Sequence, residues 1–526
     1  MLIGIDFDNT IVSYDEVFHR VAVERGLIAP GTPAVKDAVR DALRRADRED
    51  DWTELQSFVY GPGMEQAAPS PGVVEFLARC RERGVAVRII SHRTKKPFRG
   101  PAHDLHAAAY AWLASHRFFE NTGLRPEQVF FEETKAGKLS RIAEQGCTHF
   151  IDDLPEFLCE PAFPPGVERL LFDPSGTHQS PFPDVCSWAE AEALTLGAAE
   201  LCAQAQLAGP VRLARVPGAA NNRVLIARSG SSRALLKAYF THPEDTRDRV
   251  GAEFSFSRFA WDAGLRQLPR PLAFDPRRRL ALFDWVDGRR LAPEEVDAGA
   301  VLQALEFFAA LNAHRDAAMA LPEASEACFS INEHLSLVGR RVEALDHSPE
   351  SDPSFKSFVQ TELLDSWRRA EESARRLARE AGFDPARPLP RARRCLSPSD
   401  FGFHNALLGC DGRLRFLDFE YAGWDDPAKT ICDFFEQPAV PVPLSLHEEF
   451  VSGIGKVLGG DPDLAARAGL LRPVYRVKWA CILLNDFLPA AQARRRFALG
   501  STDLSERRHL QLGKARAKLR EAMQTR

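Results

Sequence analysis

The chain has 526 residues and a formal net charge of -5, and its apolar and charged fractions, 45% and 27%, are ordinary for a globular protein. This length is too great for one hydrophobic core and indicates roughly two to four domains, while the small net charge gives no support for a nucleic-acid or membrane partner. The ten cysteines show no metal-ligand spacing, so we expect reduced thiols in a cytoplasmic protein.

The first predicted element is a short apolar strand that ends in acidic residues. Residues 2–7 form an apolar run, and Asp6 and Asp8 stand at its end. In open α/β sheets, ligands bind at the carboxyl ends of the strands. Two acids two positions apart point to the same side of an extended chain, so one carboxylate can attack phosphorus while the other handles the proton of the leaving group.

Three further segments of the first third bring polar residues to the ends of predicted elements. One predicted strand ends at Ser91, Lys135 begins a predicted helix, and another predicted strand ends in Asp152 and Asp153. Single acids after strands are often only helix caps. Four such pieces in order favour a phosphate-handling site at one edge of a sheet.

These segments resemble the haloacid dehalogenase-like (HAD) hydrolase superfamily over about residues 1–190. The resemblance implies an α/β fold whose N-terminal domain is Rossmann-like, and a phosphatase that forms an aspartyl-phosphate. The implied roles are a nucleophile at Asp6, a general acid/base at Asp8, a ligand of the phosphoryl oxygens at Ser91 and a cation that neutralises the phosphate at Lys135.

The same resemblance implies a Mg²⁺ site. Its ligands would be Asp6, Asp152 with Asp153 beside it, and the backbone of Asp8. Lys138 is the alternative to Lys135 as the phosphate-neutralising cation. We favour Lys135 because it begins the helix, where a side chain can turn into the site.

The rest of the first third predicts a cap and a linker. Helical patterns between residues 10 and 85 predict a small helical cap over the site. Residues 160–185 are rich in proline and loop-forming residues, which indicates the end of the first domain. An alanine-rich helix then predicts a linker at residues 191–210.

Beyond the linker the pattern changes to short strands joined by a turn of small residues. The turn contains Gly218, Asn221 and Asn222, and small residues let backbone amides approach phosphate groups. A predicted strand carries Lys237, and the following predicted helix carries Glu253. In kinases, a strand lysine paired with a helix glutamate positions the triphosphate.

The strongest motif of the second half lies near residue 400. Asp400 stands five residues before Asn405, and Asp418 follows a short apolar run. Phosphoryl transfer from a nucleoside triphosphate needs a carboxylate that accepts the proton of the substrate hydroxyl, and an amide and a carboxylate that hold Mg²⁺. We therefore predict Asp400 as the base and Asn405 and Asp418 as magnesium ligands.

Residues 205–526 resemble the aminoglycoside phosphotransferase and choline kinase family, a branch of the protein-kinase-like fold. The resemblance implies a two-lobed α+β domain, with an N-lobe at residues 211–288 and a helical C-lobe at residues 289–526. It also implies ATP binding, and the residues concerned are Gly218, Asn221, Asn222, Lys237 and Glu253.

One position departs from the family pattern. Pro398 stands two residues before the predicted base, where the family usually has a histidine that braces the catalytic loop. The rigidity of this loop is therefore open, although proline can stiffen a loop by fixing its own backbone. We interpret the nearby His404 as structural rather than catalytic.

The two halves together predict a bifunctional phosphoryl-transfer enzyme that uses Mg²⁺ and ATP. One half would remove phosphate from a phosphorylated metabolite, and the other would transfer phosphate to a small-molecule hydroxyl, for example on a sugar. Two alternatives stay open. The kinase-like half is a nucleotide sensor that regulates the phosphatase, or the chain is an antibiotic-modifying phosphotransferase.

Overall fold

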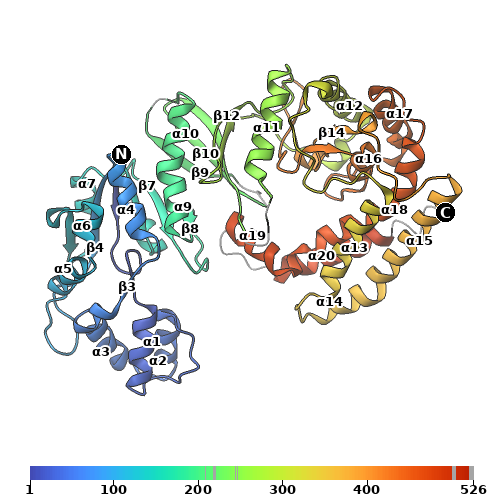
Figure 1. The fold of residues 1–526 in the computed structure, drawn as a ribbon. Coiled ribbons are helices and arrows are strands. Elements are labelled where there is room, and N and C mark those ends of the chain that lie inside the picture. The colour runs from blue at the N-terminus through green and yellow to red at the C-terminus, as the bar shows by residue number, and fades with distance from the viewer. Residues whose placement is uncertain (208, 217–220, 243–244, 246, 500–504, 521–526) are drawn as a thin grey trace. The chain divides into compact units, whose positions relative to one another are not determined.

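The computed structural model describes residues 1–526 except 208, 217–220, 243, 244, 246, 500–504 and 521–526 (Figure 1). The described chain divides into two compact units. The first consists of residues 1–200, 208–215 and 227–230, and the second of residues 201–207, 216–226 and 231–526. The predicted boundaries at residues 190, 210 and 288 remain predictions.

A six-stranded parallel sheet forms the centre of the first unit. Its strand order is β5-β4-β1-β6-β7-β8. The strands are β1 (Leu2–Ile5), β4 (Ala86–His92), β5 (Val129–Glu132), β6 (His149–Asp152), β7 (Glu168–Phe172) and β8 (Asp184–Val185). Ile5 lies opposite both Ile89 and Ile151 in register. The carboxyl ends of β1, β4 and β6 therefore meet at one edge of the sheet, as a parallel arrangement requires.

Helices bury the sheet. They are α4 (Val73–Glu82), α5 (Leu105–Ser115), α6 (Phe118–Thr122), α7 (Lys135–Glu144), α8 (Pro155–Leu158), α9 (Trp188–Glu192) and α10 (Ala198–Gln204). Leu139 and Ile142 of α7 pack with Ile90 and Phe150 of the sheet. A π-helical turn at Ala193–Gly197 joins α9 to α10, and Trp188 of α9 packs against Phe172 of β7.

A helical insertion follows β1 in the chain. It contains α1 (Asp15–Glu24), α2 (Lys36–Arg45) and α3 (Glu49–Val59), which Figure 1 shows grouped together. The short strands β2 (Val12–Ser13) and β3 (Ala68–Pro69) pair where the chain enters and leaves the insertion. Aromatic rings fill its interior, with Phe18 stacked on Trp52 at a centroid distance of 5.0 Å.

A five-stranded sheet of order β12-β13-β11-β10-β9 opens the second half of the chain. The strands are β9 (Val211–Arg215), β10 (Arg223–Ser229), β11 (Ser232–Ala238), β12 (Pro271–Asp275) and β13 (Leu280–Asp284). Strand β13 lies antiparallel to both β11 and β12. Helix α11 (Arg249–Asp262) packs on this sheet, since Val250 and Phe254 share a buried cluster with Phe283.

Beyond β13 the chain is mainly helical. The helices of this part are α12 (Ala298–Asn312), α13 (Ile331–Asp346), α14 (Pro353–Phe358), α15 (Leu364–Glu380), α16 (Pro427–Glu436), α17 (His447–Val457), α18 (Leu464–Leu483), α19 (Pro489–Leu499) and α20 (Ser505–Arg520). Short strand pairs frame the loops between α15 and α16. They are β14 (Cys395–Ser397) with β17 (Gly423–Asp425), and β15 (Ala406–Leu408) with β16 (Leu414–Phe416).

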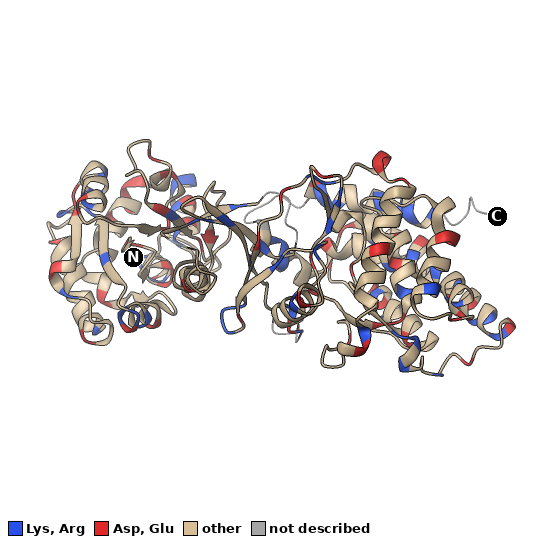
Figure 2. Ribbon diagram, turned by 90° about the horizontal axis from the view of Figure 1, so that it is seen from above, with Lys and Arg blue, Asp and Glu red and all other residues tan. Residues whose placement is uncertain are grey.

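The prediction of a mixed α/β chain is confirmed by these sheets and helices. Basic and acidic residues are interspersed over both units, as Figure 2 shows. None of the helices in the described ranges combines the length and the apolar character needed to cross a bilayer.

Candidate active sites

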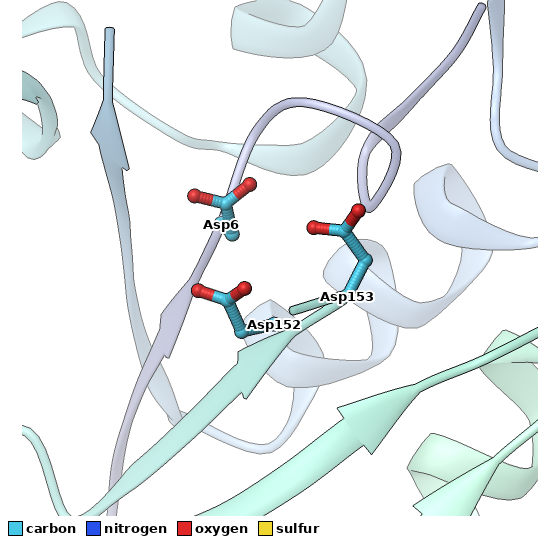
Figure 3. Close-up of side chains that lie close together, drawn as sticks. All are labelled: Asp6, Asp152 and Asp153. Atoms are coloured by element: carbon cyan, nitrogen blue, oxygen red, sulfur yellow. The ribbon is translucent and has the colours of Figure 1, made fainter. Parts of the chain in front are cut away.

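Three acidic side chains converge where β1 and β6 end. Asp6 follows β1, and Asp152 and Asp153 stand at the end of β6 (Figure 3). One carboxylate oxygen from each residue lies within 4.8 Å of the others. Sheet register causes this meeting, because Ile5 and Ile151 are partners and the backbone N–H of Asp6 donates to Ile151 O at 2.9 Å.

Lys138, and not Lys135, reaches these acids. Its Nζ lies 2.5 Å from Asp6 Oδ1 and 2.6 Å from Asp152 Oδ2, and its side chain is 2% exposed. The side chain of Lys135 is 51% exposed and faces Glu160 at 3.6 Å. The structure therefore places Lys138, the alternative, and not Lys135 beside the acids, because the buried face of α7 begins at Lys138.

Asp8 is held by two side chains from outside the sheet edge. The Tyr14 hydroxyl donates to Asp8 Oδ1 at 2.6 Å, and Arg93 NH1 donates to the same oxygen at 2.5 Å. Arg93 is buried and also donates to the backbone carbonyl of Tyr60. Ser91 is buried near the end of β4. It follows Ile89, the residue of β4 that pairs with Ile5 of β1, so it lies past the last paired residue of β1. Asp8 and Ser91 therefore lie at the same sheet edge as Asp6.

The acids of this site outnumber its buried amine. Burial, together with the charges of Asp152 and Asp8, raises the pKa of Asp6 to about 7 although Lys138 opposes the shift. Burial and the charges of Asp152 and Asp6 raise the pKa of Asp153 as well. Several carboxylate oxygens with surplus negative charge form the donor set that Mg²⁺ prefers. Asp6, Asp152 and Asp153 therefore fit a magnesium ion.

The helical insertion supplies residues that sequence reasoning did not assign to the site. Lys36, the first residue of α2, lies with its Nζ 5.9 Å from the Phe18 ring centroid and 5.7 Å from that of Tyr60. The Tyr60 ring in turn lies 5.0 Å from Tyr14, whose hydroxyl binds Asp8. Only the tertiary structure could bring Lys36 here, since no motif marks it.

A second buried lysine organises the other site. Lys237 of β11 donates to Glu253 Oε2 of α11 at 2.6 Å and also to Asp418 Oδ1. Burial works against the charged amine, but Asp418 and Glu253 raise the pKa of Lys237. Glu253 is further held by the Tyr239 hydroxyl at 2.6 Å and by the backbone N–H of Phe419 at 3.3 Å. The structure thus brings together the lysine, the glutamate and the acid that the sequence predicted.

The predicted base lies in a loop whose polar groups hold one another. Asn405 Nδ2 donates to Asp400 Oδ2 and to its backbone carbonyl, both at 3.0 Å. These bonds leave the amide oxygen of Asn405 as its metal-ligand atom. The backbone N–H of Leu417 donates to Asn405 O at 2.8 Å, which places the residue before Asp418 beside this loop. Asn405 and Asp418 each carry a side-chain oxygen of the kind that Mg²⁺ prefers.

His404 contacts the predicted base directly. Its Nε2 lies 3.1 Å from Asp400 Oδ1, while its Nδ1 is buried without a hydrogen-bond partner among the described residues. A β-carbon at Gly402 would lie 2.7 Å from this Nδ1, so glycine makes room for the ring. Although burial opposes it, the charge and hydrogen bond of His404, with the hydrogen bond of Asn405, lower the pKa of Asp400.

Only part of the predicted ATP-binding turn lies among the described residues. Gly218 lies outside the described residues. Asn221 is described and is half-buried. Asn222 is 2% exposed. Its Nδ2 donates to Glu420 Oε2 at 2.7 Å, and its Oδ1 accepts from the N–H of Phe240 at 3.3 Å. Both ends of the amide thus have partners within the protein, and Asn222 braces Glu420; its contact with ATP stays a prediction.

Three solved structures are similar to the chain at low sequence identity. Choline kinase from Cryptosporidium parvum Iowa II is 12% identical, with 60% of this chain and 90% of that chain covered at a TM-score of 0.40. A choline/ethanolamine kinase family protein from Mesorhizobium loti is 20% identical, with 62% and 94% covered at 0.38. Spectinomycin phosphotransferase, solved with ADP and spectinomycin, is 10% identical, with 61% and 97% covered at 0.42. No curated protein matches the sequence.

A protein-family model matches a part of the chain that contains the second site. Residues 212–434 match the phosphotransferase enzyme family, and this span contains Lys237, Glu253, Asp400 and Asp418. Residues before 212 lie outside the match. The prediction of a phosphotransferase enzyme is confirmed, and the family match lies in the C-terminal part of the chain.

Proposed function

We propose that the chain is a bifunctional phosphoryl-transfer enzyme. The C-terminal half would transfer phosphate from ATP to the hydroxyl of a small molecule. The N-terminal half, a Rossmann-like HAD domain with a helical cap, would hydrolyse a phosphate monoester through an aspartyl-phosphate. The observation that carries the proposal is a pair of buried lysines, each held between two carboxylates. Lys237 is the predicted residue, and Lys138 lies one helical turn after the predicted Lys135.

In the kinase half, Asp400 would accept the proton of the attacking hydroxyl. His404 and Asn405 each hold one of its carboxylate oxygens, so the base is already oriented before the substrate arrives. Lys237, fixed by Glu253, would bind the α- and β-phosphates. Mg²⁺ bound by Asn405 and Asp418 would neutralise charge on the transferred phosphoryl group.

In the phosphatase half, an Asp6 oxygen would form a bond to phosphorus as the bond to the ester oxygen breaks. Asp8, oriented by Tyr14 and Arg93, would donate a proton to the departing alcohol and later remove one from the attacking water. Water then releases inorganic phosphate and restores the Asp6 carboxylate. Lys138 would hold the carboxylate in place, and Mg²⁺ at Asp6, Asp152 and Asp153 would screen the repulsion between nucleophile and phosphate.

The two opposed reactions are compatible if they act at different positions of a metabolite. We propose a sugar or a sugar-like compound as this metabolite, phosphorylated at one carbon and dephosphorylated at another. The test is a panel of sugars, sugar phosphates and aminoglycosides, assayed separately for ADP and for inorganic phosphate. A purified enzyme that forms neither product from any compound would contradict the proposal, and turnover of aminoglycosides alone would favour an antibiotic-modifying kinase.

The departure at Pro398 supports a second candidate, in which the kinase-like half binds ATP without catalysis and regulates the phosphatase. The two candidates differ in the effect of Asp400→Asn. In the regulatory case the variant would leave the response of phosphate release to ATP intact, and the wild type would form no ADP. In the kinase case Asp400→Asn would abolish ADP formation while ATP still binds.

A further inference from the structure

An arginine cluster lies in the second unit outside the residues used above. It consists of Arg247, Arg249 and Arg494, gathered around Asp245 and Tyr421. Arg249 is the first residue of α11, and Arg494 belongs to α19. Arg494 lies 249 residues from Asp245, about half the length of the chain, and folding has brought it to Arg247 and Arg249.

Asp245 is the carboxylate that the three arginines share. Arg247 Nε and NH2 lie 2.7 and 2.9 Å from its two oxygens. Arg249 NH2 also donates to Asp245 Oδ2, and Arg494 NH2 approaches the same oxygen at 3.5 Å. Arg247 and Arg249 additionally lie over the Tyr421 ring, at 5.4 and 5.5 Å from its centroid. The cluster is thus fixed in place by one acid and one aromatic ring.

Positive charge exceeds negative charge at this point. Glu420 also lies near the cluster, with its Oε2 4.0 Å from Arg249 NH1, but this oxygen already accepts from Asn222. Glu326 acts on Arg247 as well and is paired with Arg341. Asp245 and Glu420 thus serve three guanidinium groups, while a fourth, that of Arg341, engages Glu326. Burying surplus charge is costly unless a counter-ion or hydrogen-bond partner compensates it.

Donor groups of the cluster also lack acceptors. Arg249 is 3% exposed, and its Nε and NH1 are buried without a hydrogen-bond partner, as is Nε of Arg494, among the described residues. Buried guanidinium donors are normally satisfied, so these three atoms mark an incomplete site. Burial and the repulsion of Arg249 and Arg247 lower the pKa of Arg494, and a bound anion would relieve that repulsion.

We propose that Arg247, Arg249 and Arg494 form a binding site for a phosphate group. Guanidinium forks match the oxygens of phosphate and form bidentate, charge-assisted hydrogen bonds with them. The cluster adjoins Glu420 and Tyr421, which directly follow the loop that carries Asp418. The phosphate therefore belongs either to the acceptor substrate of the kinase half, which would already be phosphorylated, or to a separate phosphorylated effector. This inference goes beyond the proposed reactions and does not require either of them.

Binding of inorganic phosphate to the full-length chain tests the site without any turnover. We expect phosphate to raise the Tm and to bind in calorimetry, while sodium chloride at the same ionic strength does not. Arg494→Gln should weaken phosphate binding at least about tenfold, because a charge-assisted contact is lost. Arg496→Gln, which removes an exposed arginine from the same helix, is the matched control and should bind like the wild type.

Two results would overturn the proposal. One is a response to phosphate no larger than that to chloride, and the other is an equal effect of Arg494→Gln and Arg496→Gln. Far-UV circular dichroism checks that Arg494→Gln is folded. If it is not, Arg494→Lys keeps the charge, loses the fork and should still weaken binding several-fold.

Kinetics then separate the two sources of the phosphate. If the acceptor carries it, inorganic phosphate should compete with the acceptor, and Arg494→Gln should raise the KM for the acceptor while the KM for ATP stays constant. If a separate effector carries it, phosphate should change kcat at saturating acceptor. Failure of the kinase assay itself would leave the calorimetric result standing, so the failure of the proposed function and that of this site are distinguishable.

Discussion

The Asp6 site and the Asp400 site both bury a lysine between two carboxylates, but different kinds of backbone hold them. Asp6 and Asp152 stand at the ends of neighbouring parallel strands, so sheet register sets their positions. Asp400 and Asp418 lie in loops, and Ser399 and Asp418 adopt positive φ angles of 66° and 67°. Such a backbone costs about 1–3 kcal/mol per residue and persists only where neighbours hold it.

This difference in backbone support predicts which mutations should lower activity at each site. At the strand ends the backbone is fixed by the sheet, so removing a reacting group should act mainly through the chemistry. In the loops, side chains such as His404, Asn405 and Tyr239 hold the reacting groups. Changes to those supporting side chains should therefore impair the kinase site even though they are not reacting groups.

The largest expected effects come from removing the two central acids. Asp6→Asn should lower phosphate release about 10⁴-fold or more, since the nucleophile is lost, and should leave ADP formation within about twofold. Asp400→Asn should lower ADP formation about 10²- to 10⁴-fold and leave phosphate release unchanged. Separate assays of ADP and phosphate on the same preparations measure both effects. Loss of both activities from either single change would contradict independent sites.

The next effect distinguishes the two lysines of α7. Lys138→Met should lower phosphate release about 100-fold or more, because it leaves Asp6 and Asp152 buried without their cation. Lys135→Met, on the exposed part of the same helix, is the matched control and should stay within about twofold of the wild type. Thermal unfolding of both variants shows whether Lys138→Met is folded. Equal kinetic effects in folded variants would argue against the assignment of Lys138.

A smaller effect is expected at the magnesium site of the first unit. Asp153→Asn removes one charged ligand, so about tenfold more Mg²⁺ should be needed for half-maximal phosphate release. Mg²⁺ should also raise the Tm of the wild type, and Asp153→Asn should reduce this shift. Asp8→Asn is not a suitable control because Asp8 is itself a proposed catalytic group, whereas Asp50→Asn changes an exposed acid of the helical insertion and is the matched control. An unchanged Mg²⁺ requirement in Asp153→Asn would remove Asp153 from the ligand set.

The smallest effect tests whether the loop depends on its supporting side chains. His404→Gln should lower kcat for ADP formation about tenfold, because Asp400 loses the hydrogen bond to Oδ1 while the base itself remains. The KM for ATP should stay constant, since His404 contacts the base rather than Lys237. His347→Gln, an exposed change elsewhere on the second unit, controls for general effects. A rise in the KM for ATP with constant kcat would show that His404 supports nucleotide binding instead.

The sequence by itself determined the identity of most groups in both sites. Runs of apolar residues followed by acids predicted strand ends at Asp6 and Asp152, because parallel strands expose their carboxyl ends at one edge. Spacing and residue type also singled out Lys237, Glu253, Asp400 and Asp418, which the structure assembles through loops and a sheet. Such groups are predictable because their chemistry allows few other residue types.

Only the tertiary structure decided which neighbours complete these sites. Lys138 replaced Lys135 because packing of α7, and not its first residue, selects the side chain that reaches the strand ends. Lys36 and the three arginines of the cluster come from segments that no local pattern connects. Likewise, Asn222 became a brace because Glu420, far along the chain, occupies its amide. Long-range contacts of this kind depend on how elements pack, which the order of residues along one segment does not specify.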